Sequence, residues 1–105
     1  MRATARVTAI ALLAASPLSA DEDFPQIDVA PQCQRSVEGL EDADVAFEMC
    51  MQGQALSFGV LRSLWPTLPP DLRRECAAYG RAEGSYAALR ICIEQAIGPL
   101  KAPTL

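Results

Sequence analysis

The four cysteines of this 105-residue chain constrain its fold more than any other residues: Cys33, Cys50, Cys76 and Cys92. An even number of cysteines in a short chain is typical of a disulfide framework in an oxidising compartment. A four-thiolate zinc site usually uses closely spaced cysteine pairs, whereas 16 and 15 residues lie between the members of the two successive pairs here. The cysteines therefore predict two disulfides rather than a metal centre or buried free thiols.

Residues 1–20 have the layout of a secretory signal peptide. Arg2 and Arg6 precede an apolar run over residues 7–15, and the small residue Ala20 precedes an acidic stretch. The apolar run covers less than half of the roughly 20 residues that a membrane-spanning helix needs. We therefore expect cleavage after Ala20, a periplasmic or secreted protein, and no membrane span after removal of the leader.

Three further regions follow the leader: an extended acidic arm over residues 21–31, a helical four-cysteine domain over residues 32–100 and a tail over residues 101–105. Two prolines keep the arm out of a helix, and we expect it to be mobile at its start. The chain lacks the sustained alternation of apolar and polar residues that marks a half-buried strand. The sequence therefore predicts an all-α fold.

The first half of the domain is predicted to form two helices. A short helix over residues 32–37 stops near Gly39, and a long helix covers residues 42–64. Asp42 or Asp44 is the expected N-cap of the long helix, because a carboxylate there accepts from unpaired amide groups. The Trp-Pro pair that follows ends the long helix, since proline cannot continue the hydrogen-bond ladder.

The second half of the domain is predicted to form another helical pair. A third helix begins at Pro70, where the missing amide hydrogen costs nothing, and ends at Tyr79 before Gly80. Ser85 is the expected N-cap of a fourth helix, which ends at Gly98.

Apolar and small residues fall on two faces of the long helix. One stripe contains Ala46, Met49, Cys50, Gly53, Leu56, Val60 and Leu64, and the other contains Phe47, Met51, Phe58, Leu61 and Trp65. A helix that is apolar on two sides is expected to be central, with neighbours on both sides. Gly53 and Gly59 disfavour a helix, and we interpret them as positions where another helix crosses closely.

Two observations favour the pairs Cys33–Cys50 and Cys76–Cys92. The residues around Cys50 and Cys92 share the pattern apolar-charged-apolar-Cys-apolar-polar, and each follows a short helix with the other cysteine. Helical rise places Cys50 about 22 Å from the end of the long helix, whereas Cys76 lies about 9 Å into the third helix. The nested alternative with a Cys50–Cys76 bridge therefore fits less well, because bridged Cα atoms lie within about 7 Å. The sequence predicts a small disulfide-stapled helical bundle, built from two helical hairpins around one long central helix.

The order of cysteines and core residues resembles small exported four-cysteine helical proteins of proteobacteria. The matching positions span residues 33–95 and comprise Cys33, Cys50, Leu61-x3-Trp65-x2-Leu68-Pro69, Arg73-x2-Cys76 and Ser85-Tyr86-x2-Leu89-x2-Cys92-Ile93. This resemblance implies export and a helical fold rather than an activity. The chain is also similar to exported lysozyme-inhibitor-like domains in its cysteines that flank a long helix, although it lacks their Asp-x2-Leu-Asn and Ala-Gln-x2-Trp runs.

Charge is distributed unevenly along the chain. The formal net charge is −4, and loss of the two leader arginines would make it −6, which disfavours nucleic acid as a partner. Residues 21–50 carry a net charge of −8 and residues 51–105 a net charge of +2. The densest acids of the predicted helical domain define a possible partner surface: Glu41, Asp42, Asp44 and Glu48. Its expected partner is an unknown periplasmic or envelope protein with a basic surface.

Catalytic interpretations of the same residues are weaker. The chain has no histidine, which removes the commonest general base and metal ligand. Acids at a helix start are explained by the helix dipole, and Met49, Cys50 and Met51 point about 100° apart, so they do not converge on copper(I).

These observations favour an exported, non-catalytic interaction or accessory module, without catalytic residues, cofactor or metal. The alternatives are a small thiol-redox or enzyme-like periplasmic protein and a lysozyme-inhibitor-like binder. Thiol-redox work typically uses a Cys-x-x-Cys pair, which this chain lacks.

Overall fold

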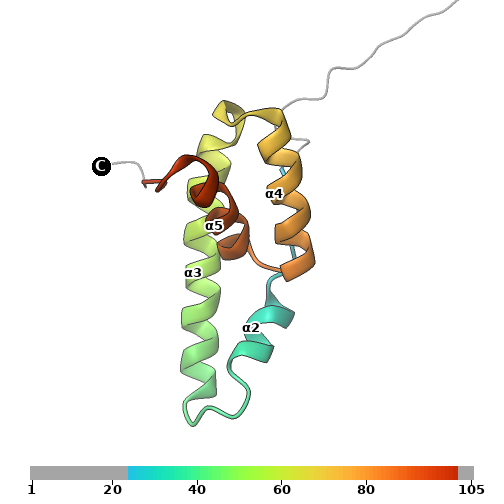
Figure 1. Ribbon diagram of the computed structural model, residues 1–105. Coiled ribbons are helices and arrows are strands. Elements are labelled where there is room, and N and C mark those ends of the chain that lie inside the picture. Colours follow the sequence, from blue (N-terminus) through green and yellow to red (C-terminus); the bar gives the residue numbers. More distant parts are fainter. Residues whose placement is uncertain (1–23, 102–105) are drawn as a thin grey trace, which may run out of the picture.

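The computed structural model describes residues 24–101 and has an all-α fold (Figure 1). Its elements in chain order are α2 (Ala30–Ser36), α3 (Ala43–Leu64), the 3-10 helix η1 (Trp65–Thr67), α4 (Pro70–Glu83) and α5 (Tyr86–Ile97). Within this range the chain contains no β-strand. The predicted leader, the first three residues of the predicted arm and residues 102–105 lie outside the described part.

The helices form two hairpins, as the sequence predicted. The long helix α3 has α2 beside its N-terminal half and α5 against its C-terminal half, and α4 packs on α5 (Figure 1). Cys33–Cys50 joins α2 to α3, with the two Cα atoms 5.7 Å apart. Cys76–Cys92 joins α4 to α5, with the two Cα atoms 5.6 Å apart. The predicted disulfide pairing is confirmed, and each hairpin is cross-linked within itself.

The hydrophobic core lies between the C-terminal half of α3 and the hairpin of α4 and α5. The largest completely buried side chains here are Trp65, Leu61, Leu89 and Ile93. Burial of one such leucine or isoleucine stabilises the folded chain by roughly 1.5–3 kcal/mol relative to leaving it exposed. This half of the molecule therefore contains most of the apolar packing.

One face of α3 has no neighbour in the described chain, so the prediction that other helices cover both of its apolar faces is wrong. Met49 and Leu56 belong to the first predicted stripe, yet they are 65% and 71% exposed. A Cβ added at Gly53 or Gly59 would meet no described atom within 4 Å outside the local helix, so no helix of the described chain crosses there. The cause is placement, since the neighbouring helices pack on the opposite face of α3 and leave this face uncovered.

Helix α4 continues past Gly80, where the sequence predicted its end, and stops at Gly84. Gly84 adopts a left-handed conformation with φ +65, which suits a glycine after a helix end. Gly80 has another role, because a Cβ there would lie 2.8 Å from the Cβ of Leu89 on α5. Its missing side chain lets α4 and α5 approach closely beside their disulfide.

Residues 24–29 form neither helix nor strand, and they pack against the core. Phe24 is buried, and its ring meets the Trp65 ring edge-on with centroids 5.0 Å apart. The Tyr86 hydroxyl donates to the Pro25 carbonyl oxygen at 2.8 Å and accepts from the Ile27 amide at 3.0 Å. This part of the acidic arm is therefore attached to α5.

Two helix starts refine the sequence prediction. Helix α2 begins at Ala30 instead of residue 32, because a proline in the first turn needs no hydrogen-bond partner for its nitrogen. Ser85 caps α5 as predicted, and its side chain accepts from the Ala88 amide at 3.0 Å.

A buried glutamine from α3 completes the cap of α5. Gln54 is 6% exposed, and its Oε1 accepts from the amides of Tyr86 at 2.7 Å and Ala87 at 3.2 Å. Its Nε2 donates to the Ser85 hydroxyl at 3.0 Å. These bonds satisfy amide groups that a helix start leaves unpaired, and they fix α5 against α3.

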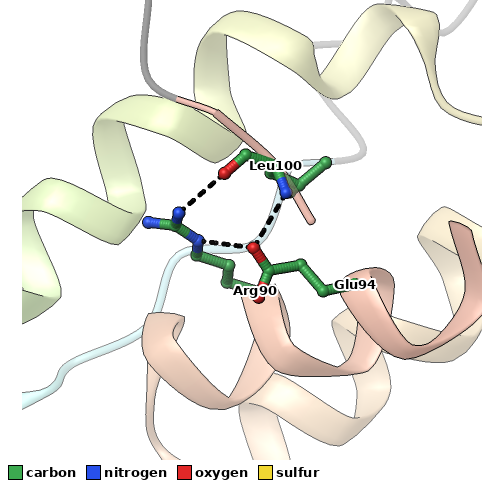
Figure 2. A network of polar contacts seen from close by, with 3 residues as sticks. All are labelled: Arg90, Glu94 and Leu100. Atoms are coloured by element: carbon green, nitrogen blue, oxygen red, sulfur yellow. Dashed lines mark hydrogen bonds and ion pairs between the residues drawn. The ribbon is translucent and has the colours of Figure 1, made fainter. Parts of the chain in front are cut away.

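The C-terminal residues fold back onto α5 through a second polar network (Figure 2). Glu94 Oε2 accepts from the Leu100 amide at 2.9 Å and from Arg90 Nε at 3.2 Å. Arg90 Nη2 donates to the Leu100 carbonyl oxygen at 2.9 Å. The Leu100 amide, followed by Arg90, lowers the pKa of Glu94 because both favour the charged carboxylate.

Candidate functional site

The four acids predicted as a partner surface lie at the turn end of the α2–α3 hairpin, and all four are exposed. Glu41 and Asp42 belong to the turn before α3, whereas Asp44 and Glu48 lie one helical turn apart on α3. Asp42 is the N-cap by position, but its side chain makes no capping hydrogen bond. Its backbone carbonyl accepts from the Ala46 amide at 2.9 Å instead. The expected carboxylate cap is therefore absent from α3.

Two of the acids border an open groove of about 240 Å³ between the end of α2 and the start of α3. The residues that line it are Gln34, Val37, Ala43, Asp44, Phe47 and Glu48. Val37 is buried and Phe47 is half-buried, so the groove combines apolar surface with two carboxylates. Glu41 and Asp42 do not line the groove, but the chain places them directly before it.

The groove is held by covalent and backbone constraints. Cys33–Cys50 joins the two helices that form its walls. In the connecting turn, the Leu40 amide donates to the Val37 carbonyl oxygen at 3.1 Å, and Gly39 takes φ +82. Few residues other than glycine adopt this φ without strain, so the turn depends on Gly39. The walls are therefore fixed without a large core beneath them.

The arrangement suits a cationic side chain with an apolar stem. Lysine and arginine carry a long aliphatic chain below a charged group, and the stem can lie on apolar surface while the charge meets carboxylates. Asp44 and Glu48 provide acceptors for the charge, and Val37 and Phe47 provide the apolar surface. The groove can therefore bind a basic, amphipathic segment.

Sequence reasoning predicted the acids but missed the groove. Phe47 was assigned to a stripe covered by other helices, and Val37 was assigned only to the short helix. The available signal was the seven-residue length of α2, which covers only part of α3 and leaves Phe47 at an edge. Gln34 carried no signal, because an isolated glutamine on a short helix is usually a solvated residue.

The cysteines and acids show little that favours the alternative chemistries. All cysteines of the described residues are in disulfides, and Cys33 and Cys76 are 0% and 1% exposed. The other cysteine of each bond, Cys50 or Cys92, is half-buried, and neither pair has the Cys-x-x-Cys spacing that is typical of redox-active disulfides. In residues 24–101, no three metal-ligating side chains lie close enough together to form a metal site.

Comparison of the chain with models of known protein families, with curated proteins and with solved structures finds no match. Among the described helices, none has both the length and the apolar character that crossing a membrane requires.

Proposed function

We propose that this chain is an exported, non-catalytic interaction module that binds a basic segment of another periplasmic or envelope protein. The observation that carries the proposal is the groove at the turn end of the α2–α3 hairpin. Its walls combine buried Val37 and half-buried Phe47 with exposed Asp44 and Glu48. A partly apolar groove that is bordered by negatively charged carboxylates suits recognition of a cationic side chain.

Two features support export. Residues 1–20 have the layout of a signal peptide, and disulfides persist in oxidising compartments such as the periplasm. The two bonds Cys33–Cys50 and Cys76–Cys92 fit such a compartment. Intact-mass measurement on periplasmic protein tests this part, with a chain that begins at Asp21 and contains two disulfides as the expected result. A retained leader or free thiols contradicts export.

The negative charge around the groove favours a positively charged partner. Glu41 and Asp42 extend the negative surface beside the groove, and opposite charges at the rim of an interface accelerate association. Salt screens such exposed charges over about 8 Å at physiological ionic strength. Capture of the partner should therefore be strongest at low salt.

A pull-down from envelope extract tests the binding site. We compare the wild type with Glu41→Gln/Asp42→Asn/Asp44→Asn, which removes three charges around the groove and leaves Glu48 in place. The matched control is Asp71→Asn/Glu75→Gln/Glu83→Gln, which removes three exposed acids of α4.

A basic protein captured by the wild type and the control, but lost with the groove variant and at high salt, is the expected result. The same set of captured proteins for all three chains at every salt concentration contradicts the proposal.

A further inference from the structure

Helix α3 has an exposed face that no described part of the chain covers. Its residues recur at alternating spacings of four and three: Val45, Met49, Gln52, Leu56, Gly59 and Ser63. All six are exposed, and the three large apolar members are 59%, 65% and 71% exposed. Alternation of four and three is the spacing that places one line of side chains against a second helix. We refer to these six residues as the α3 seam.

The α3 seam lies on the side of the helix opposite the core. Gln54, Ser57 and Leu61 are buried, and at 100° per residue they fall about half a turn from the seam. The chain therefore uses one side of α3 for its own core and leaves three large apolar side chains on the other side. Exposed large apolar residues that align along a helix mark an interaction surface more often than isolated ones do.

We propose that a second copy of this chain covers the α3 seam, with the two α3 helices antiparallel and related by a twofold axis. Antiparallel pairing about the middle of the seam sets Met49 against Gly59 of the other copy and Leu56 against Gln52. Val45 then meets Ser63. The Met49–Gly59 and Val45–Ser63 layers each join a larger side chain to a smaller one, so the two seams have complementary shapes there. Gly59, which a Cβ would not crowd within the chain, gives Met49 room in the dimer.

Charges beside the seam select the antiparallel orientation and a second copy as the occupant. Glu48 and Arg62 flank the same edge of the seam, and they are 14 residues apart, or about 21 Å along one helix. In the antiparallel pair, Glu48 of each copy lies beside Arg62 of the other, so symmetry forms this pair twice. Residues 51–70 contain no acid, and the acidic start of each α3 therefore meets a segment without negative charge. A parallel pair would instead place the two acidic ends together.

The contact of Arg62 within its own chain is compatible with this pairing. Its guanidinium carbon lies 5.8 Å from the centre of the Phe24 ring. A guanidinium has five N–H donors, so it can stack on a ring and donate to a carboxylate at the same time. The macrodipoles of two antiparallel helices point in opposite directions, which adds to the attraction.

Sedimentation equilibrium of the purified chain, from about 1 µM to about 1 mM, tests the dimer. Leu56→Glu places a charge in the seam and should raise the dissociation constant at least about tenfold. Ile91→Glu is the control, because Ile91 is an exposed apolar residue of α5 outside the seam, and it should leave the constant unchanged. Circular dichroism confirms that each variant is folded.

Charge reversal tests the orientation. Glu48→Arg and Arg62→Glu each replace two attractive contacts with two repulsive ones, and each should weaken the dimer about tenfold. The double variant Glu48→Arg/Arg62→Glu restores opposite charges between copies and should recover most of the wild-type affinity. No parallel dimer predicts this recovery.

Three results overturn the inference. A chain that stays monomeric at the highest concentration has no second copy on the seam. A dimer that Leu56→Glu leaves intact uses another surface, and a double charge reversal that fails to recover affinity excludes the antiparallel register. If association requires residues 1–20, the leader covers the seam in place of a second copy. The groove variant of the pull-down retains Glu48, so failure of the dimer and failure of the proposed function are separate results.

Discussion

Each of the two hairpins contains one disulfide, but the amount of apolar packing around the two disulfides differs. Cys76–Cys92 lies beside a core that contains Trp65, Leu61, Leu89 and Ile93. At the α2–α3 end, the buried apolar residues among those described are Cys33 and Val37. The first disulfide therefore replaces packing that a seven-residue helix cannot provide, whereas the second adds to packing that already exists.

Because of this difference, most of the apolar packing lies at the α4–α5 end, and apolar side chains stay exposed at the α2–α3 end. A well-packed core leaves few apolar side chains for a partner, and most of the large buried residues lie at the α4–α5 end. The α2–α3 end keeps Phe47 at a groove and Met49 on the surface, without loss of the fold. Residues there can change for binding because the disulfide, and not the core, holds the two helices together.

The largest expected effect compares two leucines. Leu89 is completely buried, and Leu89→Ala should lower the free energy of unfolding by about 2–5 kcal/mol, because it leaves a cavity. Leu56 is 71% exposed, and Leu56→Ala should change the free energy of unfolding by less than about 0.5 kcal/mol. Urea unfolding at a concentration where the chain is monomeric, followed by Trp65 fluorescence, measures both values. Equal losses would show that the exposed face of α3 is as well packed as the core.

The next effect compares the two disulfides. The bridged residues are 17 and 16 positions apart, so chain entropy predicts the same contribution of about 3 kcal/mol for each bond. We expect Cys76→Ala/Cys92→Ala to lower the stability measured at Trp65 by this amount. Cys33→Ala/Cys50→Ala should lower it much less, because α2 opens locally while the arm stays bound to Tyr86.

Hydrogen exchange separates local opening from global unfolding in these two variants. Loss of Cys33–Cys50 should raise exchange in α2 and the first turns of α3 and leave α5 protected. Loss of protection in α5 as well would show that the α2–α3 hairpin is part of the same cooperative unit.

The contrast between the ends also explains what the sequence could predict. Cysteine spacing, helix caps and helical rise predicted the fold class, the two pairs and the Ser85 cap, because each depends on local chemistry or on chain length. The predicted coverage of α3 was wrong, since a stripe of apolar residues on a helix does not say whether another helix packs against that face. Phe24 was missed because it stands among acids and prolines, whereas its burial depends on Tyr86, 62 residues away.

The sequence also failed to predict the roles of two glycines. Gly80 was interpreted as a helix end and Gly53 as a helix crossing, but Gly80 makes the close contact with Leu89 and Gly53 meets no described atom within 4 Å. A glycine lowers helix propensity in either case, so sequence alone does not distinguish the two uses. The groove was missed for a related reason, because it depends on where α2 ends beside Phe47.

The third prediction therefore compares these glycines. Gly80→Ala brings a Cβ within 2.8 Å of Leu89 and should lower the stability by about 1–3 kcal/mol through overpacking. Gly53→Ala adds a Cβ in open space on α3 and should raise stability by up to about 1 kcal/mol, because alanine favours a helix. Thermal unfolding of the monomeric chain measures both. A gain for Gly80→Ala would mean that α4 and α5 can separate without loss.

The smallest expected effect concerns Glu94, which holds the C-terminal residues on the well-packed half. Its pKa is lowered in the folded chain by the Leu100 amide and by Arg90, so the charged form stabilises the fold. This contribution is complete above the pKa of an unfolded glutamate, roughly 4.3, and is lost as the pH falls through the lowered value. Thermal unfolding of wild type and Glu94→Gln between neutral and acid pH measures this contribution.

We expect the wild type to melt at a higher temperature than Glu94→Gln at neutral pH, with a difference that shrinks in acid. The glutamine keeps an oxygen that can accept from Leu100 but loses the charge opposite Arg90, so the difference should be small. Asp71→Asn is the control, because the side chains of Asp71 and Arg74 are 86% and 73% exposed, and such ion pairs contribute little. A difference that stays constant with pH would assign the role of Glu94 to its shape instead of its charge. The network of Arg90, Glu94 and Leu100 would then stabilise this half of the molecule through packing, as its apolar core does.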